Sequence, residues 1–215
     1  MNTEDHYRET HATWDSIAGP YEELFMDLPI YDQTYVQFCE LLPHAKASVL
    51  ELGCGPGNIA RRLLEIHPDL DILATDVAQN MIDLARKNNP SIRTQLLDCR
   101  YLDSLSGSFD GVVCGFTIPY LAAEDVANLI AHCSRLLNPR GVLYLSFVPG
   151  SNDRSGFISG STGQRTYFYY HDRETVKEQL IQNGFNRITE EEIIYERAGG
   201  AIETHLVVHA QKNTL

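Results

Sequence analysis

Residues 49–58 read VLELGCGPGN, and this stretch decides the fold of the chain. A short apolar run ends in the acidic residue Glu51, and the glycines Gly53, Gly55 and Gly57 follow at alternate positions. Glycine adopts backbone conformations that other residues avoid, and the amide end of a helix attracts negative or polar groups. A strand, a glycine-rich turn and a helix in this order predict a place where backbone presses against a small polar molecule.

A second acidic signal comes at Asp76, which ends the next apolar run, residues 72–75. A carboxylate at this point of a doubly wound sheet is placed to accept hydrogen bonds from ribose hydroxyls. The two acids and the glycines together predict a nucleoside cofactor. The glycine spacing departs from the GxGxxG fingerprint of dinucleotide enzymes, because Asn58 occupies the position of its third glycine.

Strand-like and helix-like runs alternate through the middle of the chain. The expected strands are residues 48–52, 72–75, 92–97, 109–116 and 142–148, and helical apolar periods lie over 59–66, 77–85 and 126–137. This alternation predicts a parallel α/β sheet with right-handed crossovers. A helix from Asp172 to about Asn183, capped by Gly184, precedes two more strand-like runs, 185–196 and 202–211.

The 215 residues and 24.2 kDa fit a single domain with its own core. We expect four segments, namely an N-terminal helical cap over 1–45, a cofactor-binding core over 46–148, a loop or lid over 149–171, and a C-terminal helix with strands over 172–215. The stretch 149–166 is rich in Gly and Ser, which is typical of a long surface loop.

Composition argues against several classes of partner. The net charge of −12 and the pI of about 5.0 disfavour a surface that follows nucleic-acid phosphates. Residues 1–14 lack the pattern of a secretory signal, and the most apolar long window, 111–123, is too short to span a bilayer. The five cysteines form no CxxC pair, which favours free thiols in a reducing compartment. We therefore expect a cytoplasmic monomer or homodimer with no nucleic-acid or membrane partner.

No metal site is expected from the sequence. His205 and His209 lie four residues apart, which in a strand separates them by about 13 Å along one face, too far to share a metal ion. The chain has no HExxH motif and no EF-hand loop.

The order of these motifs resembles the class I S-adenosylmethionine-dependent methyltransferases, in particular the small-molecule type 11 branch. The resemblance is strongest from about residue 47 to 148, where ELGCGPG matches the family's first motif closely. It implies a Rossmann-like, doubly wound α/β sheet of seven strands, mostly parallel with an antiparallel last strand at 202–211, and helices on both faces. It also implies S-adenosylmethionine as cofactor and S-adenosylhomocysteine as product.

The resemblance implies a role for each motif residue. Glu51 lies near the cofactor ammonium, Asp76 binds the ribose, and Met81 packs against the adenine. Asp98 accepts a hydrogen bond from the adenine amino group, while the backbone amide of Cys99 donates to the ring. The complete implied cofactor-binding set is Tyr21, Glu51, Gly53, Cys54, Gly55, Gly57, Asp76, Val77, Met81, Asp98, Cys99 and Gly115.

Two segments of the resemblance concern the acceptor side. The end of the fourth strand, at Gly115, faces the methionine part of the cofactor and the substrate. Residues 17–21, IAGPY, resemble the family's IAxxYD segment, in which the tyrosine, here Tyr21, closes over the cofactor carboxylate. The next residue departs from that pattern, because it is Glu22 rather than Asp.

The implied activity is methyl transfer to a small-molecule acceptor by in-line displacement. The catalytic group stays unassigned, because this chain has Pro119 where many relatives have a histidine, and the candidates by position are Tyr120, His171 and Tyr21. We also expect 149–166 to act as a lid over the acceptor. The residues leave open two alternatives, a non-catalytic S-adenosylmethionine-binding or sensing module and a dinucleotide-dependent reductase on a similar fold. They do not identify the acceptor atom.

Overall fold

Seven strands form one sheet in the order β3-β2-β1-β4-β5-β9-β8 in the computed structural model, which describes residues 3–160, 163–197 and 200–214. The strands are β1 (Ser48–Leu52), β2 (Asp71–Asp76), β3 (Arg93–Leu96), β4 (Phe109–Gly115), β5 (Leu137–Phe147), β8 (Phe185–Glu196) and β9 (Ile202–Lys212). Strand β9 is antiparallel to both of its neighbours, β5 and β8, and the pairs among β1 to β5 are parallel. The predicted seven-stranded, mostly parallel sheet is confirmed.

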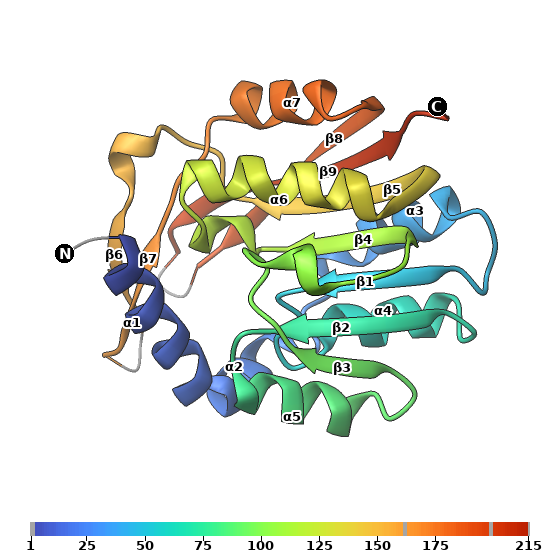
Figure 1. Ribbon diagram of the computed structural model, residues 1–215. Helices are drawn as coiled ribbons and strands as arrows, with labels where there is room; N and C mark the ends of the chain where they lie inside the picture. The colour runs from blue at the N-terminus through green and yellow to red at the C-terminus, as the bar shows by residue number, and fades with distance from the viewer. Residues whose placement is uncertain (1–2, 161–162, 198–199, 215) are drawn as a thin grey trace.

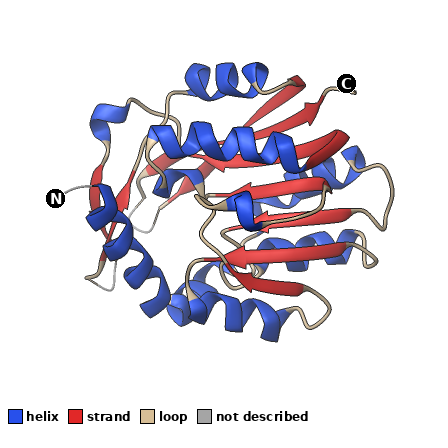
Figure 2. Cartoon of the chain, viewed as in Figure 1, coloured by secondary structure: helices blue, strands red, loops and turns tan. Residues whose placement is uncertain are grey.

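Helices cover both faces of this sheet, as Figures 1 and 2 show. Helices α3, α4 and α5 pack on one face, and α6 and α7 pack on the other. The helices are α1 (Thr3–Ser16), α2 (Ala18–Phe25), α3 (Asp32–Leu41), α4 (Asn58–Ile66), α5 (Gln79–Asn88), α6 (Ala123–Leu136) and α7 (Arg173–Gln182). Asp172 caps α7 as predicted, because its Oδ1 accepts a hydrogen bond of 2.8 Å from the Thr175 amide.

The period-two alternation of the strands divides the apolar side chains into two cores. In β1, Leu50 and Leu52 belong to the core under α6 and α7, whereas Val49 belongs to the core under α3, α4 and α5. In β4, Val112 and Val113 divide in the same way. Because both faces are buried, the side chains of the central strands are mostly apolar, as is typical of parallel sheets, and the buried carboxylate of Glu51 in β1 is an exception.

The expectation of a loop over 149–166 was wrong for most of that segment. It contains a 3-10 turn (Asn152–Arg154) and a hairpin of β6 (Gly156–Ser159) and β7 (Arg165–Phe168), while residues 161 and 162 lie outside the described part of the chain. The hairpin is ordered by α1. The His6 ring stacks on Tyr167 with centroids 3.9 Å apart, and the Thr13 hydroxyl donates to the Arg165 carbonyl at 2.8 Å.

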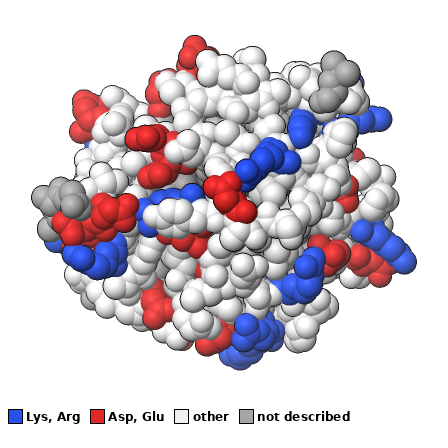
Figure 3. Space-filling model, in the orientation of Figure 1, with Lys and Arg blue, Asp and Glu red and all other residues white. Residues whose placement is uncertain are grey.

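Helix α1 and the hairpin lie beyond the carboxyl ends of the parallel strands (Figure 1). A functional site at this edge of the sheet is therefore bordered by the N-terminal cap and by the hairpin. Acidic and basic side chains are interspersed on the face shown in Figure 3. None of the described helices is long and apolar enough to cross a bilayer. All five cysteines are buried free thiols.

Because apolar cores lie on both faces of the sheet, the stability of the fold should depend strongly on the side chains of the central strands. Leu145 of β5 has no exposed surface, so Leu145→Ala should lower the free energy of unfolding by about 2–5 kcal/mol. Ile194 of the edge strand β8 is 61% exposed, and Ile194→Ala should cost about 1 kcal/mol or less. Urea unfolding of both variants measures the difference, and equal losses would contradict this placement of the core.

Candidate functional site

The loop between β1 and α4 approaches its neighbours too closely for side chains. Gly53 has φ = 69°, and a Cβ there would lie 2.6 Å from the Thr117 hydroxyl oxygen. Gly57 has φ = 85°, and a Cβ there would meet the Asn89 amide nitrogen and lie 3.1 Å from the Ala85 Cα. Both the left-handed backbone and the crowding require glycine. The loop is thus packed tightly between the end of β4 and helix α5.

Asp76, at the end of β2, fixes this loop through both carboxylate oxygens. Its Oδ2 accepts a 2.9 Å hydrogen bond from the Gly55 amide, and its Oδ1 accepts a 2.9 Å hydrogen bond from the Ala78 amide. Burial raises the pKa of Asp76, although these backbone donors and the Val77 amide oppose the rise. Each oxygen keeps a second lone pair, so the carboxylate can also accept from a ligand hydroxyl.

Glu51, at the end of β1, is a fully buried carboxylate without a partner. Neither of its oxygens has a hydrogen-bond partner in the described part of the chain. Burial raises its pKa to about 8, the charge of Asp76 adds to the rise, and the dipole of the nearby Ala60 backbone amide, which forms no hydrogen bond with it, opposes the rise. An unpaired buried carboxylate is costly unless a ligand pairs with it. A ligand with a positively charged group would satisfy Glu51.

Aromatic side chains cover the glycine loop. The Tyr21 ring lies against Gly55, because a Cβ on Gly55 would be 3.6 Å from Tyr21 Cε1. Trp14 contacts the Tyr21 ring edge-on at 5.3 Å and the Tyr120 ring at 5.1 Å. Burial raises the pKa of Tyr21 to about 12, so its hydroxyl is neutral at physiological pH. The buried Met81 belongs to the same cluster as Trp14 and Tyr21.

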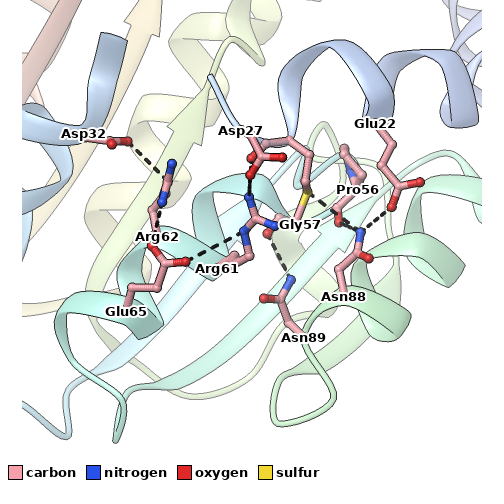
Figure 4. Close-up of polar contacts among 11 residues, drawn as sticks. Glu22, Asp27, Asp32, Pro56, Gly57, Arg61, Arg62, Glu65, Asn88 and Asn89 are labelled. Atoms are coloured by element: carbon pink, nitrogen blue, oxygen red, sulfur yellow. Dashed lines mark hydrogen bonds and ion pairs between the residues drawn. The ribbon is translucent and has the colours of Figure 1, made fainter. Parts of the chain in front are cut away.

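Helix α5 clamps the loop from the other side (Figure 4). The Asn88 side chain donates to Glu22 of α2 at 2.6 Å and to the Pro56 carbonyl at 3.0 Å, and the Asn89 side chain donates to the Gly57 carbonyl at 2.9 Å. Glu22 therefore holds α2 to the loop. Asn88 and Asn89 could not be recognised as site residues from the sequence, because an Asn-Asn-Pro sequence at a helix end has the composition of a simple terminator.

Asp98 is held by a cation in this structure. Arg100 binds the Asp98 carboxylate at 2.7 Å, contacts Glu4 of α1 at 3.0 Å and stacks over the Tyr7 ring at 3.9 Å. Cys99 is buried beside this pair. The segment predicted to bind adenine is thus joined to the N-terminal cap, and the role of Asp98 in binding adenine stays a prediction.

The candidates near the end of β4 differ in what they contact. Gly115 packs against Ile59 of α4, where a Cβ would clash. His171 is buried, and its Nε2 donates to the Ile118 carbonyl at 2.9 Å, so it fixes the turn that carries Tyr120. Burial lowers the pKa of His171. The structure therefore brings Tyr21 to the glycine loop, joins Tyr120 to the same aromatic cluster through Trp14, and gives His171 a structural hydrogen bond.

A second polar cluster lies at the same edge of the sheet. His205 of β9 has Nδ1 at 2.5 Å from the Tyr31 hydroxyl and Nε2 at 2.9 Å from Glu203, whose carboxylate binds Arg197 at 2.8 Å. From the sequence, His205 stood out only as a possible metal ligand, a role that its spacing from His209 in a strand excludes. Glu203 and His205 are polar residues two positions apart in a largely apolar strand, which indicates that they share one face of the sheet. Tyr31 is 174 positions away from His205, so no local pattern reveals this contact.

Two surface cavities lie elsewhere. One of about 450 Å³ is lined by Asp5, Arg8, Glu9 and Ala12 of α1. The other, of about 390 Å³, lies between α3 and β8 and is lined by Gln37, Glu40, Leu41, Thr189, Glu190, Glu191 and His209. Neither cavity is lined by a residue of the glycine loop. The candidate site is therefore identified by its buried polar groups and not by a surface cavity.

Comparisons with known proteins agree with this geometry. A protein-family model described as "Methyltransferase domain" matches residues 49–141. A demethylmenaquinone methyltransferase of Deinococcus radiodurans is 30% identical over 149 residues, a match that covers 60% of this chain and 61% of that protein. A putative methyltransferase of Bacillus subtilis, YqeM, is 30% identical over 135 residues, covering 60% and 53%. The chain spans about half to three fifths of the length of such curated relatives.

One solved structure extends the likeness in fold to nearly the whole chain. The 1,6-didemethyltoxoflavin-N1-methyltransferase of Burkholderia thailandensis, solved with 1,6-didemethyltoxoflavin and S-adenosylhomocysteine, has a TM-score of 0.75 and 17% identity. The alignment covers 99% of this chain and 91% of that one. The N-terminal cap and the C-terminal strands are therefore part of the shared architecture.

The loop geometry predicts unequal costs for two glycine substitutions. Gly184 has φ = 85°, like Gly57, but a Cβ there would meet nothing within 4 Å. Gly184→Ala should lose about 1–2 kcal/mol of stability from backbone strain alone. Gly57→Ala should lose about 1–3 kcal/mol more stability than Gly184→Ala, because the added methyl group would overpack against α5. Urea unfolding compares the two, and equal losses would show that the loop is not crowded.

The raised pKa of Glu51 predicts a pH dependence of stability. Between pH 4.5 and about 8 the unfolded chain has lost this proton and the folded chain keeps it, so stability falls as pH rises. The slope from this group is at most about 1.4 kcal/mol per pH unit and vanishes above the folded pKa. The free energy of unfolding, measured from pH 5 to 9, should show this fall for the wild type and lack it for Glu51→Gln. Parallel pH curves would exclude a buried, unpaired Glu51.

Proposed function

We propose that this chain, which belongs to the class I S-adenosylmethionine-dependent methyltransferases, transfers the methyl group of S-adenosylmethionine to a small-molecule acceptor. The unpaired, fully buried carboxylate of Glu51 beside the glycine loop carries the proposal. The methionine part of this cofactor bears an ammonium group, which would lower the pKa of Glu51 and pair with its ionised carboxylate.

The other groups at this edge fit the remaining parts of the cofactor. Asp76 has free lone pairs for ribose hydroxyls, and Met81 offers an apolar surface for the adenine. The glycine loop lets backbone approach the ligand without interference from side chains. Asp98 and the Cys99 amide would bind the adenine edge, with Arg100 as a neighbour.

The bound cofactor supplies a methyl group on a cationic sulfur that leaves as a neutral thioether. The protein must then hold the acceptor in line with the methyl group and exclude water. Positioning of this kind lowers a barrier by about 7–11 kcal/mol in favourable cases. Tyr21, Trp14 and Tyr120, which pack together over the loop, are placed to provide this enclosure.

The acceptor side is bordered by α1 and the β6–β7 hairpin. Their contacts are stacked aromatic rings and side chain to backbone hydrogen bonds, such as the 3.0 Å bond from the Tyr167 amide to the Thr10 hydroxyl. We propose that this pair of elements forms the lid over the acceptor, in place of the expected loop. The net charge of −12 supports a small-molecule acceptor over a nucleic acid, and the five free thiols support a reducing, cytoplasmic compartment.

Calorimetric titration tests the cofactor. S-adenosylmethionine and S-adenosylhomocysteine should bind the wild type, and NADH should not. Asp76→Ala should weaken binding about 10-fold or more, because charged hydrogen bonds are lost. Asp71→Ala is the matched control, since Asp71 is exposed at the opposite end of the same strand, and it should bind like the wild type. Failure of the wild type to bind either sulfur compound would overturn the proposal.

Turnover separates an enzyme from a binding module. A panel that carries a phenol, an amine, a thiol or a carboxylate on the same aromatic ring is incubated with S-adenosylmethionine, and release of S-adenosylhomocysteine is measured. At least one acceptor should raise the release above the acceptor-free rate. Tight binding with no turnover on any member would favour a sensing module instead.

A further inference from the structure

Tyr31, His205 and Glu203 form a buried hydrogen-bonded chain that the cofactor site does not use. Tyr31 ends the 3-10 turn η1 (Pro29–Tyr31), and the other two residues lie on β9. The Tyr31 hydroxyl lies 2.5 Å from His205 Nδ1, and His205 Nε2 lies 2.9 Å from the Glu203 carboxylate. Tyr31 is 8% exposed and His205 is 5% exposed. A polar chain this deep is costly unless every member is hydrogen-bonded.

The network assigns the direction of each hydrogen bond. Burial works against the charged form of Glu203, but Arg197 and His205 outweigh burial and lower its pKa. An ionised Glu203 only accepts, so His205 Nε2 carries the proton and Nδ1 has the free lone pair. Nδ1 therefore accepts from the Tyr31 hydroxyl. Burial lowers the pKa of His205, which keeps the ring neutral and ready to take a proton.

The chain of hydrogen bonds lies at the carboxyl end of β4. Phe116, the residue after Gly115, has its ring centroid 4.7 Å from that of His205 and 5.5 Å from that of Tyr31. Gly115 pairs with Ser146, and Ser146 pairs with Val207, so His205 stands two residues beyond this row. It lies just past the last pair of β5 with β9 and still pairs with Ile193 of β8.

The backbone at Phe116 supports a functional role for this corner. Phe116 has φ = 53°, a left-handed conformation that is an outlier for a bulky residue. Its amide donates to the Ser146 carbonyl at 3.1 Å and to the Ser146 hydroxyl at 3.0 Å, which holds the strained turn. Strain of this kind concentrates at functional sites. The turn places the Phe116 ring against the histidine.

We propose that Tyr31, His205 and Glu203 form a proton relay that deprotonates the methyl acceptor, with Tyr31 touching the acceptor and Glu203 positioning His205. This inference rests on the proposed methyl transfer. The acceptor proton moves to the Tyr31 oxygen as the Tyr31 proton moves to His205 Nδ1. The freed electron pair of the acceptor forms the bond to carbon, and the carbon–sulfur pair stays on sulfur. The imidazolium, stabilised by Glu203, later releases its proton to solvent.

Only some classes of acceptor need a general base such as this relay. A carboxylate or a thiolate is already a nucleophile at neutral pH and gains nothing from a base. A hydroxyl or a protonated amine must lose a proton before or during attack. The relay therefore implies an acceptor of the hydroxyl or amine class.

Several groups face the relay and enter its titration. Arg197 lowers the pKa of His205, and Glu203 opposes that effect. The ionisable groups that raise the pKa of Tyr31 beside it are Tyr144, Tyr21, Tyr195 and Glu203, in addition to burial. Tyr195 stacks on His205 with centroids 4.9 Å apart. Tyr195→Phe keeps that ring and serves as the matched control.

Nitrogen-15 NMR of the histidine rings tests the relay without turnover. In the full-length protein with S-adenosylhomocysteine, His205 should carry its proton on Nε2 and titrate below pH 6.5. Glu203→Gln should move this titration to lower pH, because the carboxylate that favours the imidazolium is gone. Tyr195→Phe should leave the tautomer unchanged. A proton on Nδ1, or a His205 that is charged at pH 7, overturns the relay whatever the enzyme does.

Kinetics with the acceptor panel test the role in catalysis. The wild type should methylate the phenol or the amine, and Tyr31→Phe should lower that kcat by about 10²-fold or more. Binding of S-adenosylhomocysteine should stay unchanged in the variant, and the kcat of Tyr195→Phe, which keeps the stacked ring, should fall far less than that of Tyr31→Phe. In Glu203→Gln the acid limb of the pH–rate profile should shift downward with the NMR titration.

The two proposals fail in different ways. Methylation of the carboxylate or thiol alone, or an unchanged kcat in Tyr31→Phe, overturns the relay and leaves methyl transfer standing. Loss of S-adenosylhomocysteine binding in Tyr31→Phe assigns the residue to structure and also overturns the relay. A wild type that binds no S-adenosylhomocysteine refutes the proposed function, and the ligand-free NMR titration then still reports whether the hydrogen-bonded chain has the assigned protons.

Discussion

The hydrogen bonds of Asp76 determine the geometry on which the rest of the site depends. Its two oxygens hold the Gly55 and Ala78 amides, so the end of one strand fixes both the glycine loop and the start of α5. The far end of α5 returns to the loop through Asn89 and the Gly57 carbonyl. The loop is therefore held from both ends of one helix, and the aromatic cover packs on a rigid surface.

The parts of the fold that follow from local signals could be predicted from the sequence. Apolar runs and helical periods gave the strands and helices of the core, because each pattern is complete within about ten residues. The β6–β7 hairpin was missed for the opposite reason. Its strand-forming residues, such as those of RTYF at 165–168, stand in short runs within a polar, Gly- and Ser-rich sequence. Its order comes from His6 and Thr13 of α1, about 150 positions away.

The same distinction applies to the candidate site. Glu51, the glycines and Asp76 stand out in the sequence because strand ends and tight turns have strong residue preferences. The pair of Asp98 with Arg100 lies within three residues, but nothing in the sequence shows that the cation also binds Glu4. The partner of His205 could not be predicted at all, since the Tyr31 hydroxyl meets it only through the tertiary fold.

The position of β9 between β5 and β8 has a consequence for how the chain folds. During synthesis β8 emerges before β9, its sole partner in the sheet as far as the structure describes the chain. Strand β8 therefore joins the sheet only through β9, and the β8–β9 hairpin must still pair with β5, which was made about 60 residues earlier. His205 and Glu203 arrive with β9. The half of the domain that carries the glycine loop can thus form early, whereas the corner that carries His205 is completed by a late, long-range step.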